Sequence, residues 1–143
     1  LRGAYAGVPA TEVCVSCHEP RWMQSAAFQP VRASIETGRS IAWRRVNALP
    51  DFVYFDHSAH LSHGVACETC HGRVDRMATV SQATPLSMQW CLDCHRAPER
   101  SIRPVSEIGT MGWKAPDDSV ALRRALMTRY RVRSLTDCTT CHR

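Results

Sequence analysis

Short apolar stretches interrupted by polar residues run along the whole chain. None approaches the roughly 20 consecutive apolar residues that a membrane-spanning helix requires. Two segments carry helix signals. Thr84-Pro85 has the features of an N-cap and first turn, for a helix continuing through Cys91 to His95. Asp117-Asp118-Ser119 is predicted to open a second helix, whose apolar positions are Val120, Leu122, Ala125, Leu126 and Tyr130.

The remaining segments predict extended chain or loops. Phe52 to Phe55 is a short apolar run, which favours an extended conformation directly before a histidine-rich segment. The stretches 30–40 and 98–116 are rich in turn-forming residues and are predicted as loops. Nothing in the composition marks a domain boundary, so we predict a single domain over residues 1–143.

The composition leaves little material for a conventional core. Of the 143 residues, 44% are hydrophobic, but this figure includes eight cysteines, and aromatic residues make up only 7%. The mean hydropathy is −0.28. Charged residues reach 22%, so the composition is not that of a disordered chain either. The chain is therefore expected to fold around something other than its own side chains.

The eight cysteines form four C-x-x-C pairs, and a histidine follows each pair at once. These motifs are Cys14 to His18, Cys67 to His71, Cys91 to His95 and Cys138 to His142. C-x-x-C-H is the attachment signature of c-type haem. The two thiols reach the two vinyl groups of one porphyrin, and the adjacent histidine becomes the proximal ligand of the iron.

Zinc knuckles and disulfides are the alternatives for cysteines in pairs. Neither requires a histidine at one fixed offset. Seven histidines in 143 residues occupy a given position about 5% of the time, so four matches by chance arise on the order of once in 10⁵ cases. The motifs therefore predict four covalently attached haems c, held by Cys14, Cys17, Cys67, Cys70, Cys91, Cys94, Cys138 and Cys141.

Four haems in so short a chain determine the expected fold. About 36 residues per haem are too few for a hydrophobic core around each one. We therefore expect a multihaem cytochrome c fold of the class III type, with short helices and irregular chain wrapped around the porphyrins and little β-structure. Thioether formation takes place outside the cytoplasmic membrane, which predicts a periplasmic location.

The basic charge agrees with haem binding. The chain carries a net charge of +5, and Lys114 is the only lysine among 18 basic residues. Haem propionates would reduce this charge to about +1 in the oxidised state and about −3 in the reduced state. The arginines are then mostly partners of propionates, and no nucleic-acid partner is expected.

The distal iron ligands come from a smaller set. His18, His71, His95 and His142 serve as proximal ligands, which leaves His57, His60 and His63. On a helix, residues three apart point to roughly the same side, one turn apart, so His57 and His60 are predicted to ligate two different haems. His63 continues the spacing but precedes Gly64, where the helix can end.

Three histidines cannot supply a distal ligand to each of four haem irons. The fourth haem needs a methionine, an external ligand or an open site. Met111 is the favoured ligand because the glycines at 109 and 112 allow close approach to it. A Met/His iron has a higher potential than a bis-His iron, which would give electron flow a direction.

The segments 49–60, 64–75, 90–96 and 133–143 resemble the multihaem c-type cytochrome subunit of alternative complex III, a membrane complex that oxidises quinol. The resemblance implies an iron–sulfur subunit as electron donor and integral quinol-binding subunits as neighbours. It also implies a monohaem cytochrome c or an oxidase as acceptor, and it supports the roles given to His57, His60 and Met111. That family is typically pentahaem. Here the further motif expected ahead of Cys14 is absent, so either an N-terminal haem-binding segment is missing or this member has four haems.

Three functions follow as hypotheses. The first is an electron-transfer subunit of a quinol-oxidising complex, held at the periplasmic side of the membrane and without a catalytic site of its own. The second is a free, soluble periplasmic tetrahaem shuttle. The third is a multihaem reductase of nitrogen or sulfur oxyanions, for which the sequence shows neither a C-x-x-C-K motif nor an evident acid–base cluster.

Overall fold

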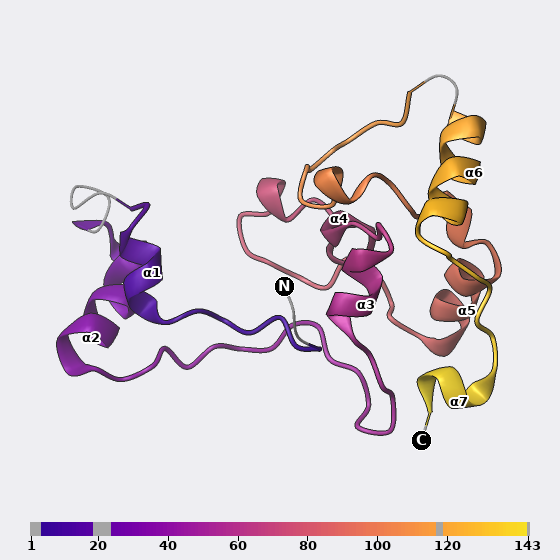
Figure 1. The fold of residues 1–143 in the computed structure, drawn as a ribbon. Coiled ribbons are helices and arrows are strands. Elements are labelled where there is room, and N and C mark those ends of the chain that lie inside the picture. The colour runs from indigo at the N-terminus through magenta and orange to yellow at the C-terminus, as the bar shows by residue number, and fades with distance from the viewer. Residues whose placement is uncertain (1–3, 19–23, 117–118, 143) are drawn as a thin grey trace. The chain divides into compact units, whose positions relative to one another are not determined.

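A computed structural model describes residues 4–18, 24–116 and 119–142 of the chain (Figure 1). Short helices alternate with long irregular segments. The α-helices are α1 (Thr11–Val15), α2 (Gln29–Thr37), α3 (His57–Ser62), α4 (Cys67–His71), α5 (Met88–Arg96), α6 (Ser119–Arg129) and α7 (Cys138–Cys141). Single 3₁₀ turns are η2 (Ala26–Phe28), η3 (Val74–Arg76), η4 (Pro98–Arg100) and η5 (Val105–Glu107). In the described part, β-structure is limited to two isolated bridges, which confirms the predicted fold class.

The chain divides into two compact units. One comprises residues 7–45, and the other comprises residues 46–143 together with the first six residues. The prediction of one cytochrome domain over 1–143 stays a prediction. No helix in the described part of the chain combines the length and the apolar character that crossing a membrane takes.

The smaller unit is built on α1 and α2. The Thr11 hydroxyl lies 2.7 Å from the buried Ser34 hydroxyl, which donates to the Arg39 carbonyl at 2.6 Å. The prediction of a loop over residues 30–40 was wrong, because α2 occupies most of this segment. Pro30 lies in the first turn of α2, where a missing N–H costs nothing, and the helix ends at Gly38 with a φ of +64°.

The larger unit is held together by pairings between distant segments. Val65 pairs with Ile102, and the Arg103 N–H donates to the Gly64 carbonyl at 2.9 Å. Gly64 ends α3 with a φ of +81°, and a Cβ at this position would collide with the Arg103 carbonyl. Only glycine therefore allows this close approach.

A second pairing joins the predicted extended run to the C-terminus of the chain. Val53 pairs with His142, and the Tyr54 N–H donates to the Cys141 carbonyl at 2.8 Å. The last cysteine motif is thus attached to the segment that leads into α3. The extended conformation of this run was predicted correctly, whereas its partner was not foreseen.

Two helix predictions have different outcomes. The predicted start of α5 at Thr84 was wrong: the hydroxyl of Ser87 accepts from the Trp90 N–H and caps the helix, whereas Thr84 donates to the Cys70 carbonyl. Helix α6 is confirmed, with Leu126 buried, although Asp117 and Asp118 lie outside the described residues. The 98–116 segment is irregular apart from η4 and η5, as predicted.

The side-chain core is small. Among the described residues, Ala66, Ile102 and Leu126 are the only buried hydrophobic residues. Phe52 remains 63% exposed and Met88 remains 67% exposed. This distribution agrees with the expectation that most of the core is supplied by a group other than the protein's own side chains.

Candidate haem-binding sites

The four motifs are named sites I to IV in chain order: Cys14–His18, Cys67–His71, Cys91–His95 and Cys138–His142. Sites II and III lie within α4 and α5, site IV spans α7 and the residue after it, and site I begins in α1. Helical spacing of i, i+3 and i+4 places both thiols and the imidazole of a motif on one side of the helix. No disulfide joins any of the eight cysteines, and each is either half-buried or exposed, so each could be attached to a haem.

At site II, the ring of His57 on α3 faces the ring of His71. The ring centres are 6.4 Å apart and the planes differ by only 5°. Two metal–imidazole bonds of about 2 Å, plus about 1.1 Å from each ligating nitrogen to its ring centre, give a separation of about 6.2 Å. At this spacing His57 and His71 could hold one iron between them.

Site III repeats the arrangement one turn further along α3. The ring centres of His60 and His95 are 6.1 Å apart, and their planes differ by 66°. Rotation about the axis through the iron is free, so this angle is as compatible with axial ligation as the first. The structure thus brings His57 and His60 to two different motifs, while their role as ligands of two different haems stays a prediction.

Backbone carbonyls orient these histidines. Nδ1 of His57 lies 3.0 Å from the Ala4 carbonyl, Nδ1 of His60 lies 2.8 Å from that of Asp56, and Nδ1 of His95 lies 2.9 Å from that of Leu135. A carbonyl can only accept, so in each case Nδ1 carries the proton. This leaves the Nε2 lone pair available for a metal.

His71 has a side-chain partner instead. Its Nδ1 lies 3.1 Å from the amide nitrogen of Asn47, whose amide oxygen is buried and has no hydrogen-bond partner among the described residues. Amide nitrogen and oxygen are assigned from their surroundings. A half-turn of the amide places the oxygen where it accepts the Nδ1 proton of His71 and frees its Nε2. Asn47 is a functional candidate that sequence reasoning missed.

Phe55 fixes the two α3 histidines from one side. Its ring centre lies 4.7 Å from that of His57, edge to face, and 4.5 Å from that of His60, stacked. Burial lowers the pKa of both His60 and His71, so these rings are neutral at neutral pH, as metal ligation requires.

Sites II, III and IV are neighbours. Burial, followed by the nearby thiols of Cys94, Cys91 and Cys67, raises the pKa of Cys70 to about 11. Burial, followed by Cys141 and Cys94, also raises the pKa of Cys91. The thiols of site II thus approach those of site III, and the thiols of site III approach those of site IV.

The flank of α4 away from its cysteines carries an ionic network. Glu68 accepts from the Arg103 guanidinium at 2.8 Å and from the Gly112 N–H at 2.6 Å. These hydrogen bonds, the one from Gly112 first, lower the pKa of Glu68. Arg103 also donates to the Thr110 carbonyl and lies over the Trp113 ring at 5.1 Å. The 109–113 segment is therefore fixed against this flank of α4.

The remaining candidates are not brought into such pairs. Met111 lies in the segment fixed by Glu68, on the flank of α4 that turns away from the site II thiols. His63 caps the C-terminal end of α3, and its exposed ring lies 2.6 Å through Nδ1 from the Ala59 carbonyl. The ring of His18 contacts Phe28 at 4.7 Å within the smaller unit. Nδ1 of His142 lies 3.4 Å from the Phe52 carbonyl. The ligand roles of these residues stay predictions.

The cysteine motifs, the spaced histidine pairs and the helical scaffold together define a c-type cytochrome with more than one haem. The chain belongs to the family of cytochrome c7 and related cytochromes c, whose model matches residues 53–143. Members of this class bind haem c covalently through such motifs.

The chain is also similar to a curated protein of Nitratidesulfovibrio vulgaris, described as the multiheme cytochrome c subunit of a menaquinone reductase. The two are 33% identical over 75 residues, which cover 48% of this chain and 32% of that protein. The chain thus matches about a third of the length of this relative.

Proposed function

We propose that this chain is an electron-transfer subunit carrying four haems c, in a membrane complex that exchanges electrons with the quinone pool. The observation that carries the proposal is the presence of two ring pairs, one at site II and one at site III. A single short helix, α3, supplies one ring of each pair. When bound, each haem takes up and releases one electron. The chain's contribution is to fix the spacing, ligation and surroundings of the irons.

The proposed ligation uses residues from every motif. His18, His71, His95 and His142 are the proximal ligands, His57 is the distal ligand at site II, and His60 is the distal ligand at site III. Because α3 holds both distal rings three residues apart, it connects the two haems directly. Met111 is our candidate for a thioether ligand at one of the remaining haems.

The proposed partners follow from the resemblance to the cytochrome subunit of alternative complex III. An iron–sulfur subunit would donate electrons that integral subunits take from quinol. A monohaem cytochrome c or an oxidase would accept them at the periplasmic side of the membrane. In this role the chain has no catalytic site of its own.

The opposite direction of electron flow is the second candidate. The similar protein of Nitratidesulfovibrio vulgaris is described as part of a menaquinone reductase, in which a quinone is the electron acceptor. A chain with this role would accept electrons from a periplasmic donor and pass them toward the membrane. The ring pairs at sites II and III serve either direction equally.

Complex membership is tested by a haem-stained native gel of salt-washed, detergent-solubilised membranes. Migration of this chain's haem with a large assembly supports the proposal, and release by salt as a small protein supports the free shuttle instead. The direction is tested on the same assembly. Haem reduction by a quinol supports quinol oxidation, whereas quinone-dependent reoxidation of haems reduced by a periplasmic cytochrome supports the reductase direction.

A further inference from the structure

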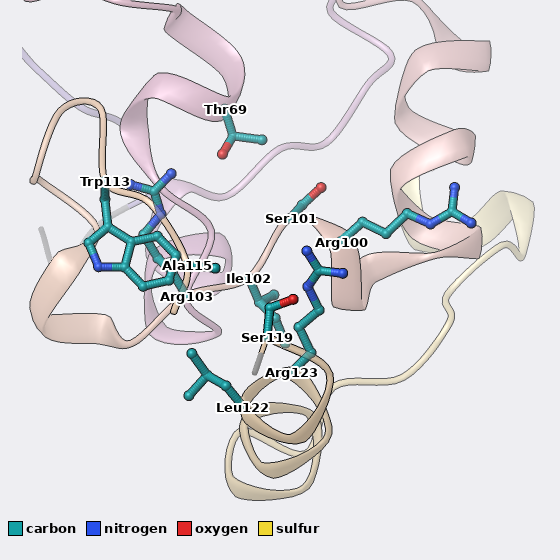
Figure 2. A pocket seen from close by; sticks show the side chains of 10 residues that line it. All are labelled: Thr69, Arg100, Ser101, Ile102, Arg103, Trp113, Ala115, Ser119, Leu122 and Arg123. Carbon is teal, nitrogen blue, oxygen red and sulfur yellow. The ribbon is translucent and has the colours of Figure 1, made fainter. Parts of the chain in front are cut away.

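A cavity of about 260 Å³ lies beside α4 in the larger unit, and its wall includes Thr69 of the site II motif. Thr69 occupies the side of α4 opposite to the two thiols and the imidazole of that motif. The cavity therefore lies on the side of α4 that faces away from the site II thiols and imidazole. Figure 2 shows Ser101, Ser119 and Arg123 converging near its middle, with Trp113 and Arg103 along one side.

Arg123 supplies a positive charge without a partner among the described residues. The charge of Arg103 is largely balanced by Glu68, to which it donates at 2.8 Å. Arg100 lies 4.0 Å from Glu99, and its side chain points away from the Trp113 wall (Figure 2). Arg123 is half-buried on α6, and no described carboxylate lies within ion-pair distance of it. The cavity thus offers one uncompensated guanidinium.

The remaining wall is partly apolar and partly hydroxylic. Ile102, Leu122 and the Trp113 ring form apolar surface, and the hydroxyls of Thr69, Ser101 and Ser119 have no hydrogen-bond partner among the described residues. A guanidinium pairs with a carboxylate through two parallel hydrogen bonds, and free hydroxyls can donate to the same oxygens. Apolar surface beside this polar group favours a ligand that has an apolar body.

We propose that this cavity binds a small organic carboxylate, with its charged group on Arg123 and its apolar part against Trp113 and Leu122. The volume admits a molecule of the size of benzoate rather than a macromolecular segment. The single uncompensated charge matches a monocarboxylate better than a dianion.

A bound carboxylate would also influence the haem at site II, an inference that rests on the proposed function. The negative charge would lie across the width of one short helix from the haem and would favour the oxidised iron. An interaction between unit charges about 10 Å apart, at an effective dielectric constant near 20, corresponds to roughly tenfold tighter binding to the oxidised state. For a one-electron couple, tenfold corresponds to a midpoint potential lowered by about 59 mV.

The test is calorimetric titration of the oxidised holoprotein with benzoate, and with benzamide as its neutral isostere. We expect benzoate to bind at one site per chain and at least tenfold more tightly than benzamide. Arg123→Ala should weaken benzoate binding at least tenfold. The matched control is Arg124→Ala, which removes the same charge from an exposed neighbouring position on α6 and should leave binding within twofold of wild type.

Three results would overturn the proposal. The first is an absence of benzoate binding to wild-type holoprotein, as would follow if a haem propionate already fills the cavity. The second is equal weakening by the two arginine variants. The third is binding that emerges only after Asp117 and Asp118 are changed to asparagine, which would mean that the chain's own carboxylates occupy the site.

The redox measurement separates this proposal from the proposed function. If a pyridine haemochrome assay finds four haems but benzoate does not bind, the electron-transfer role stands and the carboxylate site is refuted. If benzoate binds to a chain that carries no haem at site II, the carboxylate site is supported and the proposed function is refuted. With both correct, saturating benzoate lowers the midpoint of one haem by about 59 mV, and Arg123→Ala abolishes the shift.

Discussion

Asn47→Asp should lower the midpoint potential of one haem, that of site II. The amide of Asn47 lies 3.1 Å from Nδ1 of His71, and its oxygen is buried. A carboxylate in this position would hold the Nδ1 proton more strongly, make Nε2 a better donor and stabilise the oxidised iron. The change adds a full negative charge without a large change in side-chain volume.

The magnitude follows from the distance. The 3.1 Å contact, the width of the imidazole and a metal–nitrogen bond of about 2 Å place the new charge about 7 Å from the iron. At an effective dielectric constant near 20, the interaction is about 2.4 kcal/mol, which corresponds to about 100 mV. Asn47→Ala removes the hydrogen bond without adding charge and should raise the same midpoint by about 40 mV.

Spectroelectrochemical titration of the holoprotein measures both shifts, with haem content checked by pyridine haemochrome assay. Ala48→Asp is the matched control, because it adds the same charge at the exposed next residue and should shift the midpoint by less than about 20 mV. If Asn47→Asp and Asn47→Ala move the midpoint in the same direction, or neither moves it, Asn47 does not tune His71.

Four further substitutions test the rest of the larger unit. His57→Ala and His60→Ala should each create one haem that binds carbon monoxide. Each should also remove a different low-spin EPR signal, because the interplanar angle is 5° in the His57–His71 pair and 66° in the His60–His95 pair. Identical spectra for the two variants would contradict the assignment. Met111→His should remove the highest midpoint potential, and an unchanged highest potential would show that Met111 is not a ligand. Hydrogen bonds keep the pKa of Glu68 below its ordinary value of 4.5, so its stabilisation is complete above that pH and is lost as the pH falls through the lowered pKa. Denaturant titrations should therefore show Glu68→Gln to be less stable by about 1–2 kcal/mol at pH 7, and the difference should shrink as the pH falls through the lowered pKa, whereas a pH-independent difference would contradict this role.

The cofactor type and the fold class could be predicted from the sequence, because covalent attachment of haem requires a fixed local pattern of cysteines and histidine. C-x-x-C-H units indicate covalent haem c, and several haems in so short a chain favour a fold of short helices and irregular segments. The proximity of His57 and His60 to different motifs was also predictable, since i, i+3 spacing on a helix displaces the rings by one turn.

The identity of the ring partners was not predictable, because it depends on pairings between segments distant in sequence. Only the fold shows that His57 faces His71 and that His60 faces His95. The groups that hold Nδ1 of His57, His60 and His95 are backbone carbonyls, which have no side-chain signature. Asn47 does have one, but nothing local in the sequence indicates that it lies beside a motif 24 residues away.

The two helix errors have local causes. Pro30 was interpreted as a loop residue, although proline is equally common in the first turn of a helix, where it lies in α2. Thr84 and Ser87 are both good N-caps. The backbone of Leu86, with a φ of +49°, prevents a helix that begins at Thr84 from continuing, so Ser87 caps α5.

We propose that all four motifs hold a covalent haem. This proposal is tested most directly by the intact mass of the chain, purified from the compartment where it matures and measured under denaturing conditions, which remove any haem that is not covalently attached. We expect the polypeptide mass plus four haems in one dominant species. A dominant species with fewer haems, or a chain whose cysteines remain free thiols or are paired as disulfides, would contradict it.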